Sequence, residues 1–516
     1  MDGSVPCGFQ RTLILGLNGH IEINNKKYGI NTLCLEEDAA RKIAYDEKNK
    51  IITYRLDRLG IPLVEIVTDP DVRTPRECRE LAFNLGLLLR SSGLVKRGLG
   101  TIRQDINVSI KNGARVEIKG VQKLDWIEGL IDNEIERQIN LLKIKNEMES
   151  RNIKKSDFDV KIVELTEIFN QTNFNPLRSA LKKKMKVFGI KAPKMRGILG
   201  IEIQPNKRFG KEIAEKVRII TGLRGLIHSD EDLTRYKISQ EEVSNIKKKL
   251  DINEDDAFIF LFGPEDKVKN AIDVILNRLK MALDGVPQET RRAKDDFTTE
   301  FIRELHGGKR LYPDTDTSPI IINDNLIKKL KSNLPEYPWQ IIDRIYEKYK
   351  LDEHIIIELI LNERLDLFEK IVSEYNVDPI LVSTTFLEHF KALSREKVSI
   401  ENITDEHLLD LFKALSEGKI AKEIIKNILK MIANNPKQNI DQVIKKLKIE
   451  TISTESVEQI INKILEKNIN LIKEKGDRAF KPLMGDVMRS VRGKIDGKLV
   501  SSLLKEKLDK FLENLN

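Results

Sequence analysis

Cysteine and histidine are both scarce in this sequence. Three cysteines occur in 516 residues, Cys7, Cys34 and Cys78, all within the first 80 positions. So few thiols exclude a disulfide-stapled secreted domain and favour a reducing compartment. No cysteine has a nearby His in a known nucleophile context, which argues against a thiol nucleophile. The six histidines form no pair at zinc-ligand spacing, which argues against a zinc site.

Long apolar runs are also missing. No stretch approaches the roughly 20 residues that a membrane-spanning helix needs. The opening residues, MDGSVPCGFQ, lack the basic-then-apolar pattern of a signal peptide. We therefore expect a soluble, cytoplasmic protein.

A strong excess of one charge is absent as well, because 89 Lys and Arg oppose 81 Asp and Glu, for a net charge of +8. This balance excludes a histone-like polycation but leaves room for local nucleic-acid-binding patches. The charge is uneven: residues 471–516 hold 11 basic against 7 acidic residues, or +4. The segment 182–196 carries seven basic residues and no acid. Such a run is usually a solvated surface, but its Phe188-Gly189 interruption also fits a loop that touches phosphates.

The length favours three to four domains at about 150 residues each, and the patterns change along the chain accordingly. Residues 10–120 are strand-like and interrupted by glycines, and 160–284 is mixed, with a buried strand predicted at 257–262 followed by an amphipathic helix. After about residue 322 almost everything has the 3.6-residue period of helices.

The strand-like region contains two clear alternating segments and one helix. In QDINVSI (104–110) and ARVEIK (114–119) apolar and polar residues alternate, which predicts half-buried antiparallel strands. Between the strands, Thr74, Pro75 and Glu77 form a capping signature for a helix that Gly93 would end. A second helix is predicted at about 124–147.

Carboxylates are the first candidates for chemistry. Glu36, Glu37 and Asp38 follow an apolar strand, and Glu65 lies inside the apolar segment PLVEIV. A lone carboxylate there is costly to bury unless it is paired or binds a cation, so Glu37 and Glu65 are candidate Mg²⁺ ligands. The alternative is that Glu37 is solvated and that Glu65 lies on an open face or pairs with Arg58.

Cations are the second candidates. Lys96, Arg97 and Arg103 surround the turn GLGT, and Arg115 and Lys119 share a strand face with Glu117. Such a mixed face suits phosphoryl transfer, although a salt-bridged solvent face is the commoner meaning of the pattern. RGLGT lacks the spacing of a P-loop and is a weak signal.

Several long motifs resemble the B/E family of tRNA-dependent amidotransferases. The catalytic "cradle" of that family is similar to VPCGFQRT, CLEEDAAR, YRLDRLGIPLVEIVTDPDVRTPREC, VKRGLGTIRQDINVSI and ARVEIKGVQKLDWI. Further on, VPQETRRA and RLYPDTDTSPI resemble the return of the chain to the cradle, and KPLMGDVMRSVRGKIDGKLVSSLLKEKL resembles the family's tail. The segment RGILGIEIQPNKRFGKEIA resembles an insertion shared with bacterial-type aspartyl-tRNA synthetases.

The resemblance implies an α+β multi-domain fold. It comprises an antiparallel β-rich cradle at 1–164, an α/β insertion of the aspartyl-tRNA-synthetase kind at 165–282, a return segment at 283–321, an all-α helical domain at 322–440 and a YqeY-like tail at 441–516. An aspartyl-tRNA synthetase relative is disfavoured, because only the insertion matches.

The resemblance also implies an activity, in which ATP and Mg²⁺ are used to phosphorylate the side-chain carboxylate of glutamate on misacylated Glu-tRNA(Gln). Ammonia then displaces phosphate, leaving Gln-tRNA(Gln). A separate asparaginase-like D subunit would supply the ammonia, in a heterodimer or a dimer of heterodimers. The rival interpretation is a non-catalytic tRNA-binding or assembly protein that keeps the scaffold.

The resemblance places the metal site at Glu37 and Glu65, with Glu36 beside them. We expect Arg58, Arg103, Asp105, Glu117 and Lys119 to line the catalytic pocket, and Lys96, Arg97 and Arg115 to bind the nucleotide. The basic residues expected to grip the tRNA body are in the tail: Lys473, Lys475, Arg478, Lys481, Arg489, Arg492, Lys494 and Lys498.

In one respect the sequence departs from the family. The cradle normally begins upstream of DGSVPCGFQRT, with a strand that carries a Glu and a His of the metal site. We therefore expect the first domain to be incomplete and this chain alone to be weakly active or inactive in phosphorylating Glu-tRNA(Gln).

Overall fold

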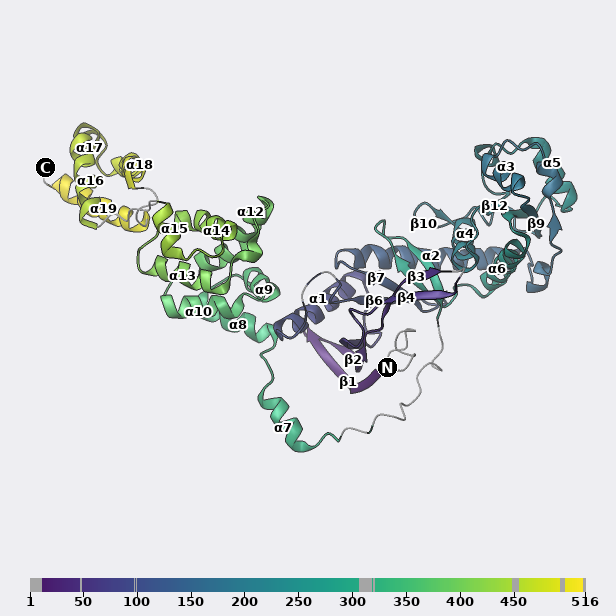
Figure 1. The fold of residues 1–516 in the computed structure, drawn as a ribbon, viewed down its shortest axis with the longest axis horizontal. Coiled ribbons are helices and arrows are strands. Elements are labelled where there is room, and N and C mark those ends of the chain that lie inside the picture. Colours follow the sequence, from purple (N-terminus) through teal and green to yellow (C-terminus); the bar gives the residue numbers. More distant parts are fainter. Residues whose placement is uncertain are drawn as a thin grey trace. The chain divides into compact units, whose positions relative to one another are not determined.

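The computed structural model describes residues 12–46, 49–96, 98, 100–305, 318, 321–447, 454–491 and 497–513. The chain divides into two compact units (Figure 1), one of Met1–Gly86 and Lys96–Ile322, the other of Leu87–Val95 and Asn323–Asn516. The fold is mixed α/β, with several small sheets in the first unit and a helical C-terminal region. This confirms the broad fold class expected from the sequence.

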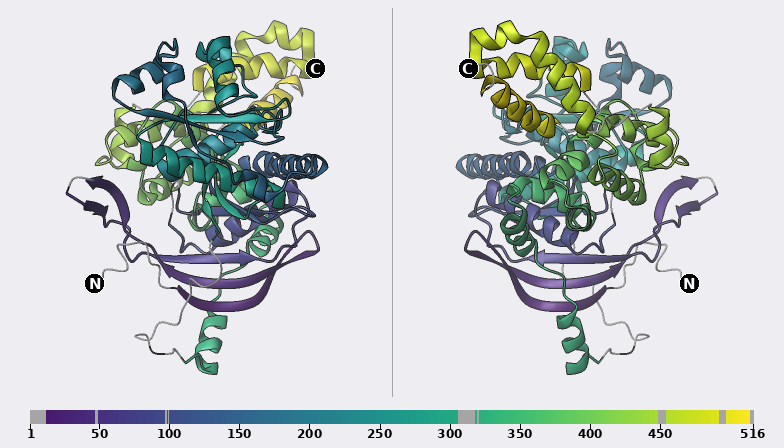
Figure 2. Two further views of the ribbon diagram at one scale, coloured as in Figure 1. Left: turned by 90° about the vertical axis from the view of Figure 1, so that its right-hand side faces the viewer. Right: turned by 90° about the vertical axis from the view of Figure 1, so that its left-hand side faces the viewer.

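The first sheet is antiparallel in the order β1-β2-β5, and the β3–β4 hairpin is inserted between β2 and β5. Asn24 and Asn25 both have positive φ, as a two-residue turn between β1 and β2 requires. Figure 2 shows this sheet as a curved ribbon. The strands are β1 (Thr12–Ile23), β2 (Lys26–Glu37), β3 (Arg41–Asp46), β4 (Ile51–Arg55) and β5 (Pro62–Thr68).

The helix predicted after this sheet is α1 (Pro75–Ser91), and its cap is largely as expected. The backbone N–H of Glu77 donates to Thr74 Oγ1 at 3.2 Å. The Glu77 carboxylate accepts from the backbone N–H of Arg73 at 2.7 Å and pairs with Lys26 at 2.7 Å. The acid therefore ties the start of the helix to β2 as well as capping it.

The second sheet has the order β15-β14-β7-β6 and confirms the two alternating segments as strands. One face, with Val116 and Ile118 fully buried, packs against the helix that follows. The sheet is mixed rather than antiparallel, because β14 runs parallel to β7 after more than 160 intervening residues. The elements are β6 (Gln104–Val108), β7 (Val116–Val121), α2 (Trp126–Ser150), β14 (Glu289–Ala293) and β15 (Thr299–Glu304).

The third sheet, β12-β13-β9-β8, is antiparallel and apolar on both faces. The strand predicted at 257–262 and the helix after it are both confirmed. Its strands are β8 (Val163–Glu164), β9 (Lys186–Ala192), β12 (Ile227–His228) and β13 (Ala257–Gly263), and a small pair is formed by β10 (Glu202–Gln204) and β11 (Lys207–Arg208). The surrounding helices are α3 (Asn175–Lys182), α4 (Phe209–Thr221), α5 (Gln240–Lys249) and α6 (Glu265–Asp284).

The phosphate-loop interpretation of the basic run 182–196 is wrong. Phe188 and Gly189 lie in strand β9, and Phe188 is buried. Lys186 pairs with Glu164 and Glu265, and Lys191 pairs with Asp256 at 2.9 Å. Acids from distant parts of the chain thus neutralise cations that have no acid near them in sequence.

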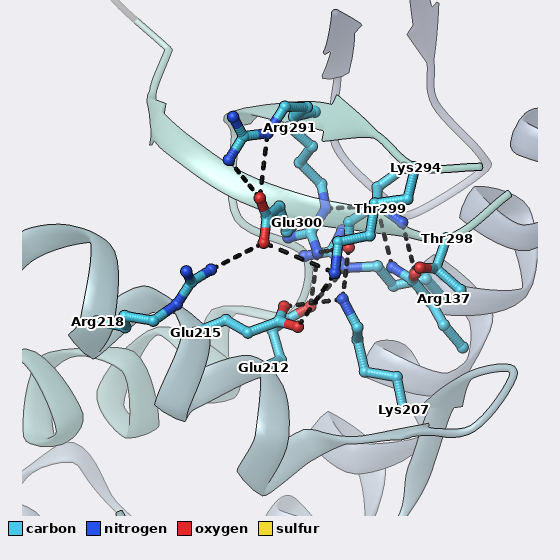
Figure 3. Close-up of polar contacts among 12 residues, drawn as sticks. Arg137, Lys207, Glu212, Glu215, Arg218, Arg291, Lys294, Thr298, Thr299 and Glu300 are labelled. Carbon is cyan, nitrogen blue, oxygen red and sulfur yellow. Dashed lines mark hydrogen bonds and ion pairs between the residues drawn. The ribbon is translucent and has the colours of Figure 1, made fainter. Parts of the chain in front are cut away.

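A buried ionic cluster fixes β14 against the helices of this unit. Arg137 on α2 is fully buried and donates to Glu212 on α4 at 2.7 Å and to Glu289 on β14 at 2.6 Å. Arg278 on α6 pairs with Glu212 at 2.9 Å, and Arg291 pairs with Glu289. Figure 3 shows Arg137 and Glu212 within this network. Because buried charges need such partners, the network holds α2, α4, α6 and β14 in one arrangement.

The described residues of the second unit beyond 323 form helices only, as the sequence period predicted. The tail has its own core, in which Val457, Ile461, Leu483 and Leu504 are fully buried. The helices are α7 (Asp324–Ser332), α8 (Pro338–Tyr349), α9 (Glu353–Leu361), α10 (Leu365–Tyr375), α11 (Pro379–Thr384), α12 (Phe390–Arg395), α13 (Asp405–Ser416), α14 (Ile425–Asn434), α15 (Ile440–Lys446), α16 (Thr454–Lys467), α17 (Ile469–Lys475), α18 (Phe480–Val491) and α19 (Gly497–Glu513). Among the described residues, no helix has both the length and the apolar character needed to cross a membrane.

Candidate active site

The exposed face of the second sheet carries an acid–base cluster. Lys119 Nζ lies 2.5 Å from Asp105 Oδ2 and 3.2 Å from Glu117 Oε1. Glu117 and Lys119 alternate with the buried Val116 and Ile118 along β7, so both point away from the core. A register shift between Gln104 and Ile106 places Asp105 at an irregularity of β6, a common device for directing a side chain. Three of the predicted pocket residues therefore form one cluster.

The ammonium of Lys119 is held firmly in its charged form. Burial lowers its pKa, but the hydrogen bond and charge of Asp105, together with Glu117, outweigh burial and leave the pKa raised. Lys119 is therefore a fixed cation at neutral pH rather than a proton acceptor. Such a group stabilises negative charge on a neighbouring oxyanion.

Glu65 and Glu36 approach this cluster from the first sheet. Glu65 is opposite Cys34 in the β2–β5 pair, and Glu36 lies two residues beyond Cys34, so both acids share one face. Glu65 is exposed on β5, as the alternative interpretation of an open face expected. Desolvation by neighbouring groups and then the charge of Glu36 raise the pKa of Glu65, with Asp105 and Glu117 adding to the effect and Lys119 opposing it. The other four residues thus lie within electrostatic reach of Glu65, and we call the five the two-sheet site.

Glu37 lies on the other face of the first sheet. It is opposite Pro62, and the alternation of side chains along β2 turns it away from the face of Glu36 and Glu65. The sequence alone could not show whether Glu36 or Glu37 shares a face with Glu65, because this depends on the register in which β2 pairs with β5. The structure brings Glu65 together with Glu36, not with Glu37.

Asp38 is a site residue that the sequence analysis did not select. It is buried, and its Oδ2 lies 3.2 Å from Arg58 Nε and 3.7 Å from Arg103 Nη2. Its backbone N–H donates to Ile61 O at 2.8 Å. Arg58 and Arg103 thus converge on one carboxylate directly after β2, and Arg58 does not pair with Glu65. The sequence signal that could have identified Asp38 is its place in the run of three acids, Glu36, Glu37 and Asp38.

The structure describes two of the three residues predicted to bind the nucleotide. Lys96 and Arg115 are exposed, and Arg115 lies one residue before β7 begins. Arg97 lies outside the described residues. Two residues that the sequence analysis missed, Thr290 and Arg292 on β14, do lie on the polar face: Thr290 is in register with Glu117 and Arg292 with Lys119. Thr290 Oγ1 donates to Glu117 Oε2 at 2.8 Å.

The predicted tRNA-binding residues that the structure describes are on the tail surface. All five are exposed: Lys473, Lys475, Arg478, Lys481 and Arg489. Arg489 pairs with Asp486 at 2.8 Å, a contact within one helix. Arg492 and Lys494, and the side chain of Lys498, lie outside the described residues.

Within the described residues, no group of three or more His, Cys, Asp or Glu side chains is arranged to hold a metal ion. Glu36 and Glu65 nevertheless supply the hard oxygen donors that Mg²⁺ prefers, and Mg²⁺ commonly binds through one or two carboxylates plus substrate phosphates. Desolvation first, and then the charge of Glu36, raise the pKa of Glu65, so the two acids repel each other when both are ionised. A divalent cation between them would relieve that repulsion, so the two residues fit the ion.

Comparison with protein families matches residues 1–328 to the GatB/GatE catalytic domain and residues 366–508 to a second model, the GatB domain. The first match contains every residue of the two-sheet site.

Curated relatives extend the match to nearly the whole chain. The chain is 46% identical over 510 residues to the E subunit of the glutamyl-tRNA(Gln) amidotransferase of Methanocaldococcus jannaschii, covering 98% of this chain and 80% of that protein. The proteins of the same name from Thermococcus sibiricus and Pyrococcus abyssi are 44% and 46% identical over 511 residues, covering 99% of this chain and 80% of each relative.

Proposed function

Because the chain belongs to the GatB/GatE family, we propose that it is the transamidating subunit that converts Glu-tRNA(Gln) to Gln-tRNA(Gln) with ATP. The relatives' shared name supports this substrate and reaction. The single structural observation that carries the proposal is the two-sheet site. In this site the carboxylates Glu36 and Glu65 face the fixed cation Lys119, which lies on the face formed by β6, β7 and β14.

The reaction needs activation because a carboxylate is a poor acceptor for an amine. An oxygen of the glutamyl carboxylate attacks the γ-phosphorus of ATP, giving an acyl phosphate and ADP. Ammonia then attacks the acyl carbon, the C–O bond to phosphate breaks, and an amide, phosphate and a proton are released. The protein's task in both steps is to position the reactants and to balance charge.

Glu36 and Glu65 would hold Mg²⁺ on their shared face. When bound, this ion shields the phosphates and polarises the transferred phosphoryl group. Desolvation and mutual repulsion raise the pKa of Glu65, so the acid pair is poised to gain a cation. Glu37, on the opposite face of β2, has no place in this arrangement.

Lys119 would stabilise the charge that develops on the transferred group or on the acyl oxygen. Asp105 and Glu117 position its ammonium and keep it protonated. Arg58 and Arg103, both directed to Asp38, would shape the end of the site where β2 leaves the first sheet. Lys96, Arg97 and Arg115 remain candidates for nucleotide contact without a geometric argument in their favour.

The ammonia would come from a partner, an asparaginase-like D subunit, in a heterodimer or a dimer of heterodimers. The cysteine and histidine usage of the chain offers no amidase nucleophile of its own. The exposed basic residues of the tail, Lys473 to Arg489, would bind the phosphates of the tRNA body. We assign the cradle to 1–164 and 283–321, the insertion to 165–282, the helical domain to 322–440 and the tail to 441–516.

Replacing one acid tests the proposal. Glu65→Gln keeps the shape of the side chain but removes its charge. We expect formation of Gln-tRNA(Gln) by the chain with its ammonia-supplying partner to fall about 100-fold or more, because one charge-stabilising group of this kind is worth that much. Affinity for tRNA, measured by filter binding, should stay the same.

The matched control is Glu22→Gln, an exposed acid on β1 of the same sheet, which pairs with Lys27 in the register rather than with the site. It should retain wild-type activity. Wild-type transamidation by Glu65→Gln would contradict the catalytic assignment. Absence of transamidation in a wild-type complex whose cradle is complete, with tRNA binding intact, would favour a non-catalytic tRNA-binding scaffold.

A further inference from the structure

Three cations converge on one acid at the edge of the second sheet. Glu300 on β15 accepts from Arg292 Nε on β14 at 3.0 Å and from Arg218 Nη2 on α4 at 2.9 Å. Lys294 Nζ lies 3.7 Å from the same carboxylate and 3.9 Å from Glu215. Figure 3 shows Arg218 and Lys294 directed toward Glu300. Nothing in the reaction described above uses these residues.

The acid is buried while the cations face solvent. The Glu300 side chain is 7% exposed, against 56% for Arg292 and 36% each for Arg218 and Lys294. Burial raises the pKa of Glu300, but the three cations outweigh burial and leave it lowered, so the carboxylate is ionised. Its two oxygens are shared among three cations, which leaves guanidinium and ammonium donors free to face outward.

The surroundings do not cancel this positive charge. Lys207, also close by, pairs with Glu215 at 2.7 Å, yet burial and the charges of Arg291 and Lys294 lower its pKa. Asp296 also lies within electrostatic reach of Lys294 and Lys207. The cluster then has three carboxylates and four cations. The carboxylates are Glu215, Asp296 and Glu300, and the cations are Lys207, Arg218, Arg292 and Lys294. The cluster therefore has one net positive charge, and three of its four cations face solvent.

The cluster adjoins the catalytic face. Arg292 is in register with Lys119 in the β7–β14 pair, and Thr290, two residues earlier, is bonded to Glu117. Arg292 therefore extends the row of polar side chains from the site toward the edge of the sheet. A group bound at the cluster would lie one strand away from Lys119.

We propose that Arg218, Arg292 and Lys294, held by Glu300, form a phosphate-binding subsite at the rim of the active site. A planar guanidinium held by a buried acid presents a fork of donors that matches a phosphate oxyanion. The phosphate belongs either to the triphosphate of ATP or to the backbone of the RNA substrate. The assignment of this subsite to the active site rests on the proposed function, but the binding of phosphate by these residues does not.

The test uses the full chain with Arg292→Ala, and measures ATP binding by equilibrium dialysis and tRNA binding by filter binding. Arg292 is the most exposed member, so its loss leaves the core intact. We expect the dissociation constant to rise about tenfold or more in at least one arm, the size expected for a lost hydrogen bond to a charged group. Arg292→Lys, which keeps the charge but not the fork, should recover part of the loss. The control is Arg235→Ala, an exposed arginine of the insertion that pairs only with the neighbouring Asp232 among the contacts the structure describes.

Weaker binding of ATP by Arg292→Ala assigns the subsite to the nucleotide, and weaker binding of tRNA assigns it to RNA. Weaker binding of both ligands supports a subsite that serves both. Unchanged binding in both arms overturns the inference, as does an equal loss in Arg235→Ala or a wild-type chain that binds neither ligand. If Arg292→Ala fails to fold, as judged by circular dichroism, Arg292→Lys decides by the same criteria. Weakened binding in Arg292→Ala, without any transamidation by a wild-type complex whose cradle is complete, would refute the proposed function and leave the subsite standing.

Discussion

Two clusters of acids and bases lie in the same unit and share residue types, but differ in burial. Around Arg137, buried arginines and glutamates from α2, α4, α6 and β14 bond to one another. Arg137 lies 2.6 Å from Glu289 and 2.7 Å from Glu212, and Arg278 lies 2.9 Å from Glu212. Around Lys119, carboxylates and a cation from two sheets lie half-exposed, and Glu65 and Glu36 repel each other.

This difference distinguishes a cluster with a structural role from a cluster with a catalytic role. The Arg137 cluster is closed to solvent, and its role is to fix the positions of four elements. Two of its buried atoms, Glu134 Oε2 and Arg278 Nη1, have no hydrogen-bond partner within the described residues.

The Lys119 cluster has a half held by ion pairs, Lys119 with Asp105 and Glu117. In its other half, Glu36 accepts a hydrogen bond from Thr12 Oγ1 at 3.4 Å, but neither Glu36 nor Glu65 forms an ion pair within the described residues. An acid pair without a bound cation, facing a fixed cation, is the arrangement that a metal ion and a charged substrate can complete.

Breaking the buried cluster should give the largest change in stability. Arg137→Met removes one of the two arginines that Glu212 and Glu289 share in the core, the other being Arg291. We expect the free energy of unfolding to fall by about 3–5 kcal/mol, the usual cost of removing one member of a buried ion pair. Denaturant unfolding followed by circular dichroism measures this.

Arg76→Met is the control, because Arg76 forms only an exposed pair with Glu80 one turn along α1, worth about 0.3–0.5 kcal/mol. Equal effects of the two substitutions would remove the contrast between buried and open clusters.

The open cluster should show the reverse pattern. In Lys119→Met we expect transamidation to fall about 100-fold, because the fixed cation that opposes the developing charge is lost. The free energy of unfolding should change by no more than about 1 kcal/mol, since the side chain is partly exposed. Activity per folded molecule and denaturant unfolding, measured on one preparation, check both statements. A loss of stability like that of Arg137→Met, with activity kept, would make Lys119 a structural residue.

Local features of this fold could be predicted from the sequence. Alternation identified β6 and β7 and the outward direction of Glu117 and Lys119, because a strand with one buried face shows that period directly. The capping signature at Thr74 located the start of α1. The apolar run at 257–262 identified a strand buried on both faces.

Long-range features could not be predicted, since they depend on pairing between distant segments. Thr290 bonds to Glu117 across 173 positions, and nothing local sets the parallel register that brings them together. The choice between Glu36 and Glu37 depends on how β2 pairs with β5, because a shift of one residue exchanges the two faces. Besides Glu134 on its own helix, the partners of Arg137 come from two other elements, α4 and β14, so its burial leaves no pattern in any one of them.

The most direct measurement of the central claim compares two adjacent acids. Glu36→Gln and Glu37→Gln alter the same chemistry at neighbouring positions, one on the face of Glu65 and one on the opposite face. The assay is ATP-dependent conversion of Glu-tRNA(Gln) over a range of Mg²⁺ concentrations. We predict that Glu36→Gln lowers the rate about 100-fold and requires more Mg²⁺, while Glu37→Gln stays within about threefold of wild type. The opposite ranking, with Glu37→Gln the inactive variant, would contradict the assignment of the active site to this face.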